Sequence, residues 1–270
     1  VAAVEEAMKD PHLAGLHVVS GLHPGWTFED YLERLRTLHE TFPKLYLKGF
    51  TGVEITHFSK ISGLSVREVL EKLQGAGLCA IAGGGAEILS DRVRQELCPK
   101  KATAAEWLEA ARTAHGLGIK SNASMLYGHI ETLAERVDHL LALRSLQDET
   151  GGFRAFITWT FQPGYTELGN EGRDKVSSWD YMNTLALSRL YMDNVSHIQG
   201  SWVTQGERIG ELSLSFGADD LGSIMLEENV VRAAGTQYEM SVAKMVRMIK
   251  NAGRQPAQRN TKYEILKRFS

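Results

Sequence analysis

GLCAIAGGGAEILSDRV, residues 77–93, places a short apolar run before three consecutive glycines and an acid. The apolar run has the composition of a buried strand, and the glycines follow where such a strand would end. A Walker-type phosphate loop needs a lysine and a hydroxyl beside its glycines, but Ala86, Glu87 and Ile88 follow here. The stretch therefore predicts either a strand that opens onto a ligand or a tight turn in which Glu87 begins the next helix.

The same order of a short β-rich stretch and a longer helical stretch recurs along the chain. Strands are expected to start at Leu16, Leu45, Cys79, Ile119, Phe153, His197 and Gly222. Amphipathic helices are expected over residues 28–42, 65–77 and 103–118. This alternation predicts an α/β protein with parallel strands, arranged as a barrel or as a doubly wound sheet. Because no Rossmann fingerprint is present and polar or glycine clusters follow nearly every strand, the (βα) TIM-type barrel is favoured.

The composition indicates which partners to expect. The 270 residues include 30 Lys+Arg and 33 Asp+Glu, and no block of like charge would attract a nucleic acid or an anionic membrane. No apolar run reaches the roughly 18 residues of a membrane span, and no secretory signal is seen, so a cytoplasmic protein without nucleic-acid or membrane partners is expected. Cys79 and Cys98 are expected to be free thiols, because their spacing matches no common disulfide framework or zinc site.

SMLYGHIET, residues 124–132, gathers several polar side chains at the end of one expected strand. The plainer interpretation is that Thr132 caps the next helix and Glu135 completes a capping box. That interpretation leaves the other polar groups without a role, so a polar ligand is also indicated. These groups are Ser124, Tyr127, His129 and Glu131.

Further candidate residues follow the later strands. Pro163 cannot donate to a strand ladder, so the strand before it should end there and place Gln162 at the barrel mouth, or in a packed rim turn. Residues 167–178 form a polar stretch that is the candidate lid. The last two strands are followed by indole, hydroxyl, amide and carboxylate groups, which could hold an aromatic substrate and a sugar. The plainer interpretation is that the two adjacent glutamates begin a helix. These groups are Trp202, Thr204, Gln205, Glu227, Glu228 and Asn229.

Histidines and carboxylates near the early strands, such as His23, Glu54 and His57, also permit a metal-dependent hydrolase of the barrel type. Such an enzyme would need a paired His-x-His at its first strand, and no strand of this sequence carries that spacing.

SGLHP, AGGGAEIL, MLYGHIET and RVDHLLALRSLQDETGGF together resemble the menaquinone and deazaflavin branch of the radical S-adenosylmethionine (SAM) enzymes, over almost the whole chain. WTFQPGYT and HIQGSWVTQG resemble the subfamily that cyclises dehypoxanthine futalosine. KGFTGVEITHFSK and ELCPKKATAAEWLE are closer to the sister subfamily that makes aminofutalosine, so both activities stay open. The resemblance implies SAM and a 4Fe-4S cluster as cofactors, a small nucleoside substrate, and an electron donor such as flavodoxin or ferredoxin.

The CxxxCxxC motif that holds the cluster in this family, on the loop after the first barrel strand, is absent from the sequence. We therefore expect residues 1–270 to be one radical SAM barrel domain that lacks its first strand and cluster loop and is inactive alone. A cluster-free barrel that only binds nucleosides stays open as a different class of function.

The resemblance also implies roles for individual residues, none of them as a metal ligand. SAM is expected to contact Gly21, Gly84, Glu87, Ser124 and Tyr127. The substrate is expected to contact Gln162, Trp202, Thr204 and Gln205. In the implied reaction a SAM-derived radical takes a hydrogen from the ribose, and the carbon radical adds to the benzoate ring. An electron and a proton then leave, and the candidate bases for that proton are His129, Glu131 and Glu228.

Overall fold

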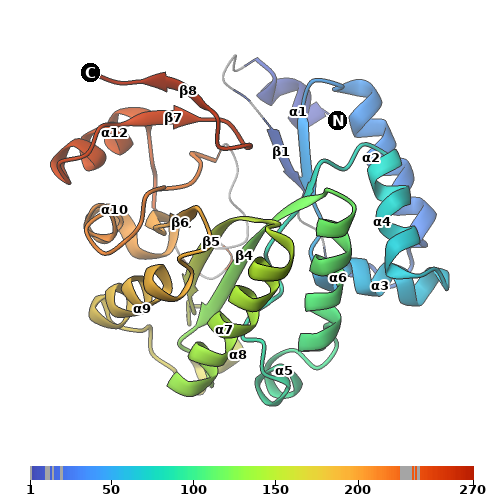
Figure 1. Ribbon diagram of the computed structural model, residues 1–270, viewed down its shortest axis with the longest axis horizontal. Coiled ribbons are helices and arrows are strands. Elements are labelled where there is room, and N and C mark those ends of the chain that lie inside the picture. The colour runs from blue at the N-terminus through green and yellow to red at the C-terminus, as the bar shows by residue number, and fades with distance from the viewer. Residues whose placement is uncertain are drawn as a thin grey trace.

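The computed structural model describes residues 2–9, 13, 15–18, 21–225, 233, 235 and 238–270. Six parallel strands form one sheet in chain order (Figure 1): β1 (Gly15–Val18), β2 (Tyr46–Gly49), β3 (Ala80–Ile81), β4 (Lys120–Tyr127), β5 (Phe153–Thr160) and β6 (His197–Gln199). A doubly wound sheet would reverse its strand order at a switch point. Because the order here does not reverse, the sheet is the wall of a barrel, and the predicted α/β fold with parallel strands is confirmed.

The seventh predicted strand, starting at Gly222, is wrong over residues 222–225, which have no strand, and residues 226–229 lie outside the described part of the chain. The last parallel pairing is a single bridge between Gln199 and Asp220. The pairing stops there because the Asp220 carboxylate accepts the backbone N–H of Gly222 at 2.7 Å, which turns the chain out of the sheet.

Helices cover the outside of the sheet (Figure 1). They are α1 (Ala2–Ala7), α2 (Phe28–Thr41), α3 (Gly52–Ser62), α4 (Val66–Gly75), α5 (Asp91–Leu97), α6 (Ala104–Gly116), α7 (Leu133–Thr150), α8 (Glu167–Asn170), α9 (Ser178–Tyr191), α10 (Trp202–Ser213) and α12 (Val242–Asn251). The three helices predicted over residues 28–42, 65–77 and 103–118 are confirmed as α2, α4 and α6. Each begins at a capping box, so neighbouring residues alone fix its start.

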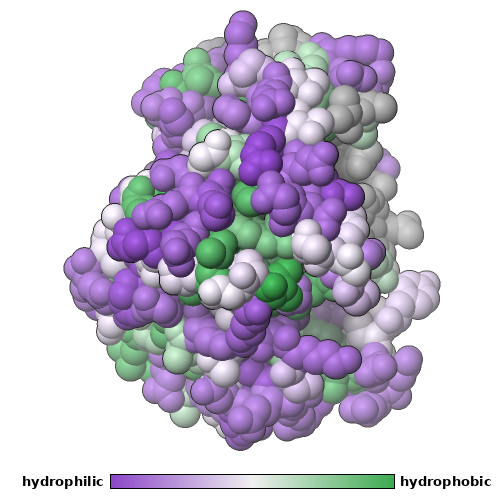
Figure 2. Space-filling view, turned by 90° about the vertical axis from the view of Figure 1, so that its right-hand side faces the viewer, coloured by the Kyte–Doolittle hydropathy of each residue, from purple (hydrophilic) through white to green (hydrophobic). Residues whose placement is uncertain are grey.

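The strands separate a packed outer face from a concave inner face. Leu47 is fully buried in the core cluster that includes residues of α2, α3 and α4, whereas its neighbours Tyr46 and Lys48 are only half-buried and point the other way. On the outside, the side that carries these three helices is mostly hydrophilic, with small hydrophobic areas between hydrophilic residues (Figure 2). In the described residues no helix combines the length and the low polarity needed to cross a membrane.

An antiparallel hairpin of β7 (Ala257–Arg259) and β8 (Ile265–Arg268), which the sequence did not predict, lies at the amino-terminal end of the barrel strands. Tyr263 in its turn stacks on His197, the first residue of β6, with ring centroids 4.2 Å apart. Thr261 lies against Gly15, the first residue of β1, because a Cβ added there would be 2.9 Å from the Thr261 hydroxyl oxygen. We call residues 257–268 the floor hairpin, since they cover this end of the barrel.

Candidate functional site

The three glycines after β3 serve different purposes. A Cβ at Gly83 would lie 2.4 Å from the carbonyl oxygen of Asn122 on β4, so only glycine allows this close approach. Gly85 has a φ of 73°, in the left-handed region that favours glycine. Gly84 has no such constraint, because the atom nearest to an added Cβ is a Thr51 methyl carbon at 3.5 Å. The packing around Gly84 would therefore tolerate a side chain, unlike that around Gly83.

The glycine loop is fixed by Arg94, a residue that the sequence analysis missed. Arg94 lies on α5, is only 3% exposed, and donates to the carbonyl oxygens of Ala86 at 2.5 Å and Gly85 at 3.1 Å. Trp107 donates its indole N–H to the carbonyl oxygen of Gly84 at 3.1 Å. An arginine within a short polar helix has the sequence pattern of a surface residue, so no local signal indicates this role.

The interpretation in which Glu87 begins a helix is wrong. Glu87 has a φ of 43°, and α5 starts only at Asp91, after Ser90. Its carboxylate pairs with Lys101 at 2.7 Å, and its carbonyl oxygen accepts the N–H of Leu126 at 3.0 Å. The chain therefore turns at Gly84 and Gly85 and runs through an irregular loop before α5 begins at Asp91.

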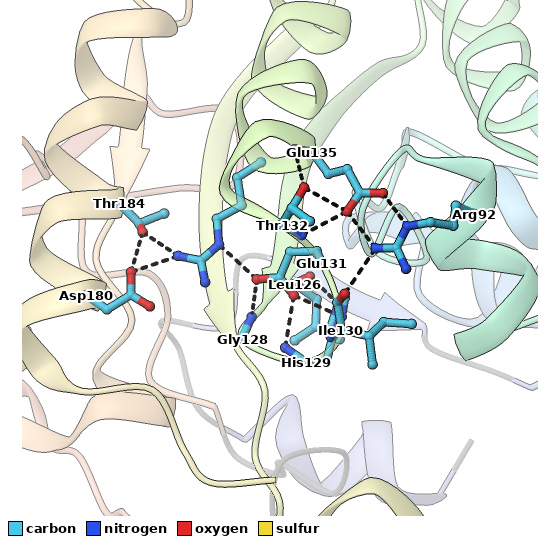
Figure 3. Close-up of polar contacts among 11 residues, drawn as sticks. Arg92, Leu126, Gly128, His129, Ile130, Glu131, Thr132, Glu135, Asp180 and Thr184 are labelled. Carbon is cyan, nitrogen blue, oxygen red and sulfur yellow. Dashed lines mark hydrogen bonds and ion pairs between the residues drawn. The ribbon is translucent and has the colours of Figure 1, made fainter.

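The turn after β4 is organised around the Glu131 carboxylate (Figure 3). Its two oxygens accept the backbone N–H groups of Gly128 at 2.8 Å and His129 at 2.9 Å. Arg136 adds a third donor, with its Nε 2.8 Å from Glu131 Oε1. The Glu131 side chain is 1% exposed, so these donors replace the water that an ionised carboxylate would otherwise bind.

His129 is also held within this turn. The N–H of Ile130 donates to Nδ1 at 2.7 Å, so Nδ1 acts as an acceptor, and Nε2 donates to the carbonyl oxygen of Leu126 at 2.9 Å. Burial lowers the pKa of His129, although the Glu131 charge beside it acts in the opposite direction. Burial thus favours the neutral imidazole with its proton on Nε2, although Nδ1 also lies 3.0 Å from Glu131 Oε2. Glu228, the third candidate base, lies outside the described residues.

Two arginines attach this turn to the surrounding helices (Figure 3). Arg136 on α7 also pairs with Asp180 on α9 at 2.7 Å. Arg92 on α5 binds both carboxylate oxygens of Glu135, at 2.8 and 2.6 Å, and the carbonyl oxygen of Ile130 at 3.0 Å. Glu135 also completes the predicted capping box at Thr132, which is confirmed. The turn is thus held from both sides.

Two predicted cofactor contacts on β4 lie on opposite faces of the sheet. The Ser124 hydroxyl donates to the carbonyl oxygen of Gly83 at 2.6 Å and so joins the glycine loop. Tyr127 is fully buried in the core on the outer face, with the Arg136 guanidinium 4.4 Å from its ring centroid. Gly21, a third predicted contact, is exposed, and a Cβ added there would meet no atom within 4 Å.

Three of the four predicted substrate contacts meet around Thr160, at the end of β5. Gln162 and Gln205 donate to the Thr160 hydroxyl oxygen at 2.9 and 2.6 Å, and Thr204 lies 3.3 Å from the Gln205 amide nitrogen. The fourth residue, Trp202, is 5% exposed and packs into the core. Thr160 was missed, because a threonine inside an apolar strand has the pattern of a packing residue.

The candidate lid, residues 167–178, contains the short helix α8 and lies across the ends of the strands. Lys175 donates to the carbonyl oxygen of Thr204 at 2.5 Å, at the start of α10. Val176 packs on Gly128 after β4, where an added Cβ would come within 2.3 Å of its methyl carbon. The segment therefore contacts the turn after β4 and the start of α10, where Thr204 and Gln205 lie.

The described residues do not fit an iron–sulfur cluster. Such a cluster is held by several cysteine thiolates, and Cys79 and Cys98 are both free, as predicted. Across the described ranges no group of three or more His, Cys, Asp or Glu is placed to hold a metal ion. The metal-dependent hydrolase therefore has no site among these residues either.

Comparison with known proteins identifies the family. Residues 25–143 match the model of the radical SAM superfamily, and residues 150–269 match that of the CofH/MqnC C-terminal region. The fold is similar to the crystal structure of HydG, a maturase of the FeFe-hydrogenase, with a TM-score of 0.70 at 16% identity over 97% of this chain and 57% of that one. The six parallel strands are thus those of a radical SAM barrel, and the predicted fold is confirmed.

Two relatives identify the family within the radical SAM superfamily. The chain is 46% identical over 246 residues to cyclic dehypoxanthine futalosine synthase of Streptomyces coelicolor, which covers 91% of this chain and 61% of the relative. It is 45% identical over 267 residues to aminodeoxyfutalosine synthase of Thermus thermophilus, covering 97% of this chain and 72% of the relative. The chain belongs to the CofH/MqnC family of radical SAM proteins. It spans 61% of the length of the Streptomyces relative.

Proposed function

We propose that the whole protein cyclises dehypoxanthine futalosine on the futalosine route to menaquinone, and that residues 1–270 belong to a single barrel domain of it. The observation that carries this proposal is the 46% identity, over 91% of the chain, to a synthase of cyclic dehypoxanthine futalosine. The second candidate is aminodeoxyfutalosine synthesis, because a relative of that name is 45% identical over 97% of the chain.

Radical SAM proteins use SAM with a 4Fe-4S cluster, which together supply a carbon radical. We derive no step through the cluster, since the described residues offer no set of thiolates for it. We propose that SAM lies against Gly21, Gly84, Ser124 and Glu87. In support, neither glycine is required by the packing around it, because an added Cβ would meet no atom within 4 Å at Gly21 and a methyl carbon at 3.5 Å at Gly84.

We propose that Glu131 and His129 position the turn after β4 and that Glu228 remains the candidate base. A base must accept the proton that leaves when the aromatic ring is restored. Protonation of Glu131 would weaken the hydrogen bonds that it accepts from Gly128, His129 and Arg136, which is costly inside the protein. Both ring nitrogens of His129 are already engaged within the turn, Nδ1 with the Ile130 N–H and Glu131, and Nε2 with the carbonyl oxygen of Leu126.

The pocket around Thr160 and the lid have a different role in this proposal. The hydroxyl and amide groups of Thr204, Gln205 and Gln162 would bind the sugar hydroxyls of the nucleoside. The lid, with Lys175 and Val176 against the strand ends, would keep water and other hydrogen donors away from a reactive carbon radical.

The test uses the full-length gene product that contains this sequence, reconstituted anaerobically with iron and sulfide. The protein is incubated with SAM, reduced flavodoxin as the proposed electron donor, and either dehypoxanthine futalosine or a chorismate-derived enolpyruvyl benzoate. Cyclisation gives a product that lacks one pair of hydrogens relative to dehypoxanthine futalosine, together with 5′-deoxyadenosine, and mass spectrometry detects both. Turnover of the enolpyruvyl benzoate alone would establish the second candidate. Turnover of neither, with a nucleoside still bound, would indicate the binding barrel.

A further inference from the structure

Basic side chains gather on the concave face of the barrel, below the glycine loop. One of them, His17, is neutral at pH 7, because desolvation and the Lys48 charge lower its pKa to about 4. His17 on β1 pairs in register with Lys48 on β2, so the two side chains lie on the same face of the sheet. That face is the concave one, because Leu47, the residue just before Lys48, is fully buried against the helices on the other side of the sheet. His17 is exposed and Lys48 half-buried. Both side chains therefore keep some contact with solvent on the concave inner face, which we call the hollow, and are not part of the packed core.

Arg154 reaches the same hollow from the far side of the sheet. It lies on β5 and donates to the Tyr46 hydroxyl oxygen at 2.7 Å, although β3 and β4 separate the two strands. Adjacent strands lie about 4.8 Å apart, so a contact over two intervening strands requires both side chains on the concave face of a curled sheet. The Tyr46 hydroxyl donates in turn to the carbonyl oxygen of Cys79 at 3.1 Å. This chain of bonds fixes the position of Arg154.

The two cations Lys48 and Arg154 lack a carboxylate partner among the described residues. With the Asn122 amide turned to the orientation that satisfies its neighbours, Lys48 donates to the amide oxygen at 3.1 Å. Burial lowers the pKa of Lys48 to about 8, and the positive charges of Arg259 and Arg154 lower it in the same direction. Arg259 itself is paired with Asp220. An interior cation without an opposite charge is costly, so this region favours an anionic ligand.

We propose that Lys48 and Arg154, with His17 beside them, bind the carboxylate of an aromatic acid substrate inside the barrel. This inference rests on the proposed function, in which the substrate is a benzoate derivative. Lys48 pairs in register with Ala80, and Gly83 is three residues further along the chain. At about 3.3 Å per residue, Lys48 lies about 10 Å below the glycine loop. The acid would therefore point toward the floor hairpin and the sugar toward the strand ends.

The test is equilibrium binding to the full-length enzyme without reductant, so that no turnover occurs. Titration calorimetry measures the affinities of dehypoxanthine futalosine, its methyl ester and free benzoate. Wild type is compared with Lys48→Met and Arg154→Met, and with Lys44→Met as the matched control, because Lys44 is exposed and lies just before β2. Lys48→Arg keeps the charge. Circular dichroism checks that each variant is folded.

We expect Lys48→Met and Arg154→Met each to weaken binding of the free acid about tenfold or more, as for loss of a charged hydrogen bond. Binding of the methyl ester should change far less, Lys44→Met should behave as wild type, and Lys48→Arg should recover most of the affinity. Equal affinities of Lys48→Met and wild type for the acid, or an equal loss for acid and ester, would overturn the proposal.

Two further titrations distinguish this proposal from a failure of the proposed function and from binding of the SAM carboxylate. If the enzyme neither binds nor converts dehypoxanthine futalosine but binds benzoate in a way that Lys48→Met abolishes, the anion site stands and the proposed function fails. If the enzyme converts dehypoxanthine futalosine and Lys48→Met binds it as wild type does, the anion site fails alone. S-adenosylhomocysteine should bind Lys48→Met and wild type equally. A loss there would assign the cations to the carboxylate of SAM and would also overturn the proposal.

Discussion

Glu131 and Arg136 form a buried ion pair, 2.8 Å from Oε1 to Nε, at the end of β4. The other side of the same guanidinium pairs with Asp180, so one side chain ties the turn to α9. We expect Arg136→Met to lower the free energy of unfolding by about 3–5 kcal/mol, because it leaves a buried carboxylate without its partner. Urea denaturation of the full-length protein measures this change. Arg112→Met is the control, since Arg112 pairs with exposed Glu149 and its loss should cost at most about 1 kcal/mol. Similar losses in both variants would contradict the prediction.

The adjacent glycines Gly83 and Gly84 offer a matched pair of substitutions. Gly83→Ala would place a Cβ 2.4 Å from the carbonyl oxygen of Asn122, so it should destabilise the fold by about 1–3 kcal/mol or more. Gly84→Ala meets only a methyl carbon at 3.5 Å and should unfold near the wild-type temperature. If SAM lies there, however, Gly84→Ala should weaken binding of S-adenosylhomocysteine severalfold. Thermal scans and titration calorimetry give the two readouts, and unchanged affinity would place SAM elsewhere.

Buried histidines predict that mild acid destabilises the protein. Burial lowers the pKa of His115 to about 4 and that of His139 to about 3, below the value near 6.5 of an unfolded chain. The unfolded state therefore binds these protons first, so the stability is complete above pH 6.5 and is lost as the pH falls. Each histidine should cost roughly 1–2 kcal/mol between pH 6.5 and 5.

The variant that tests this is His139→Gln. His139 accepts the N–H of Leu89 and donates to the carbonyl oxygen of Ser124, both at 3.1 Å, and a glutamine amide offers the same pair of groups without titrating. The slope of unfolding free energy against pH should become shallower in this variant over the same interval. An unchanged slope would show that other groups cause the acid sensitivity.

If residues 167–178 close over the site as a lid, they should keep SAM cleavage coupled to product formation. Lys175 joins the lid to α10 through the carbonyl oxygen of Thr204. Lys175→Met should loosen the lid and admit other hydrogen donors, so the ratio of 5′-deoxyadenosine to product should rise severalfold. Chromatography of both compounds in the full-length enzyme measures the ratio. Lys72→Met, on the exposed side of α4, should leave it at the wild-type value. A ratio that stays constant in both variants would argue against a closing role.

The features that the sequence predicted depend on nearby residues. The helix starts at Thr27, Ser65, Thr103 and Thr132 each need only a carboxylate three positions later. The strands before the glycine loop and before Pro163 follow from composition and from the missing donor of proline. In the same way, the clustering of polar groups after β4 and β5 follows from the shared edge of parallel strands.

The features that were missed depend on contacts between distant residues. Arg154 and Tyr46 are 108 positions apart and meet because the sheet curls, which no local pattern reports. Arg94 has the pattern of a surface residue until the glycine loop folds over it. The seventh strand was predicted from an apolar run after Gly222. The Asp220 carboxylate, two residues earlier, accepts the Gly222 N–H and turns the chain out of the sheet. Tyr127 lies on the outer face, since alternate residues of β4 point to opposite sides.

The floor hairpin has a consequence for how the protein is made. Thr261 lies against the first residue of β1 and Tyr263 stacks on the first residue of β6, so both contacts involve a segment translated after all six strands. While the ribosome is still extending the chain, the strands can pair but the basic interior stays open to water from below. Covering that interior is therefore among the last events in the folding of the nascent chain, after the helices and the sheet have formed.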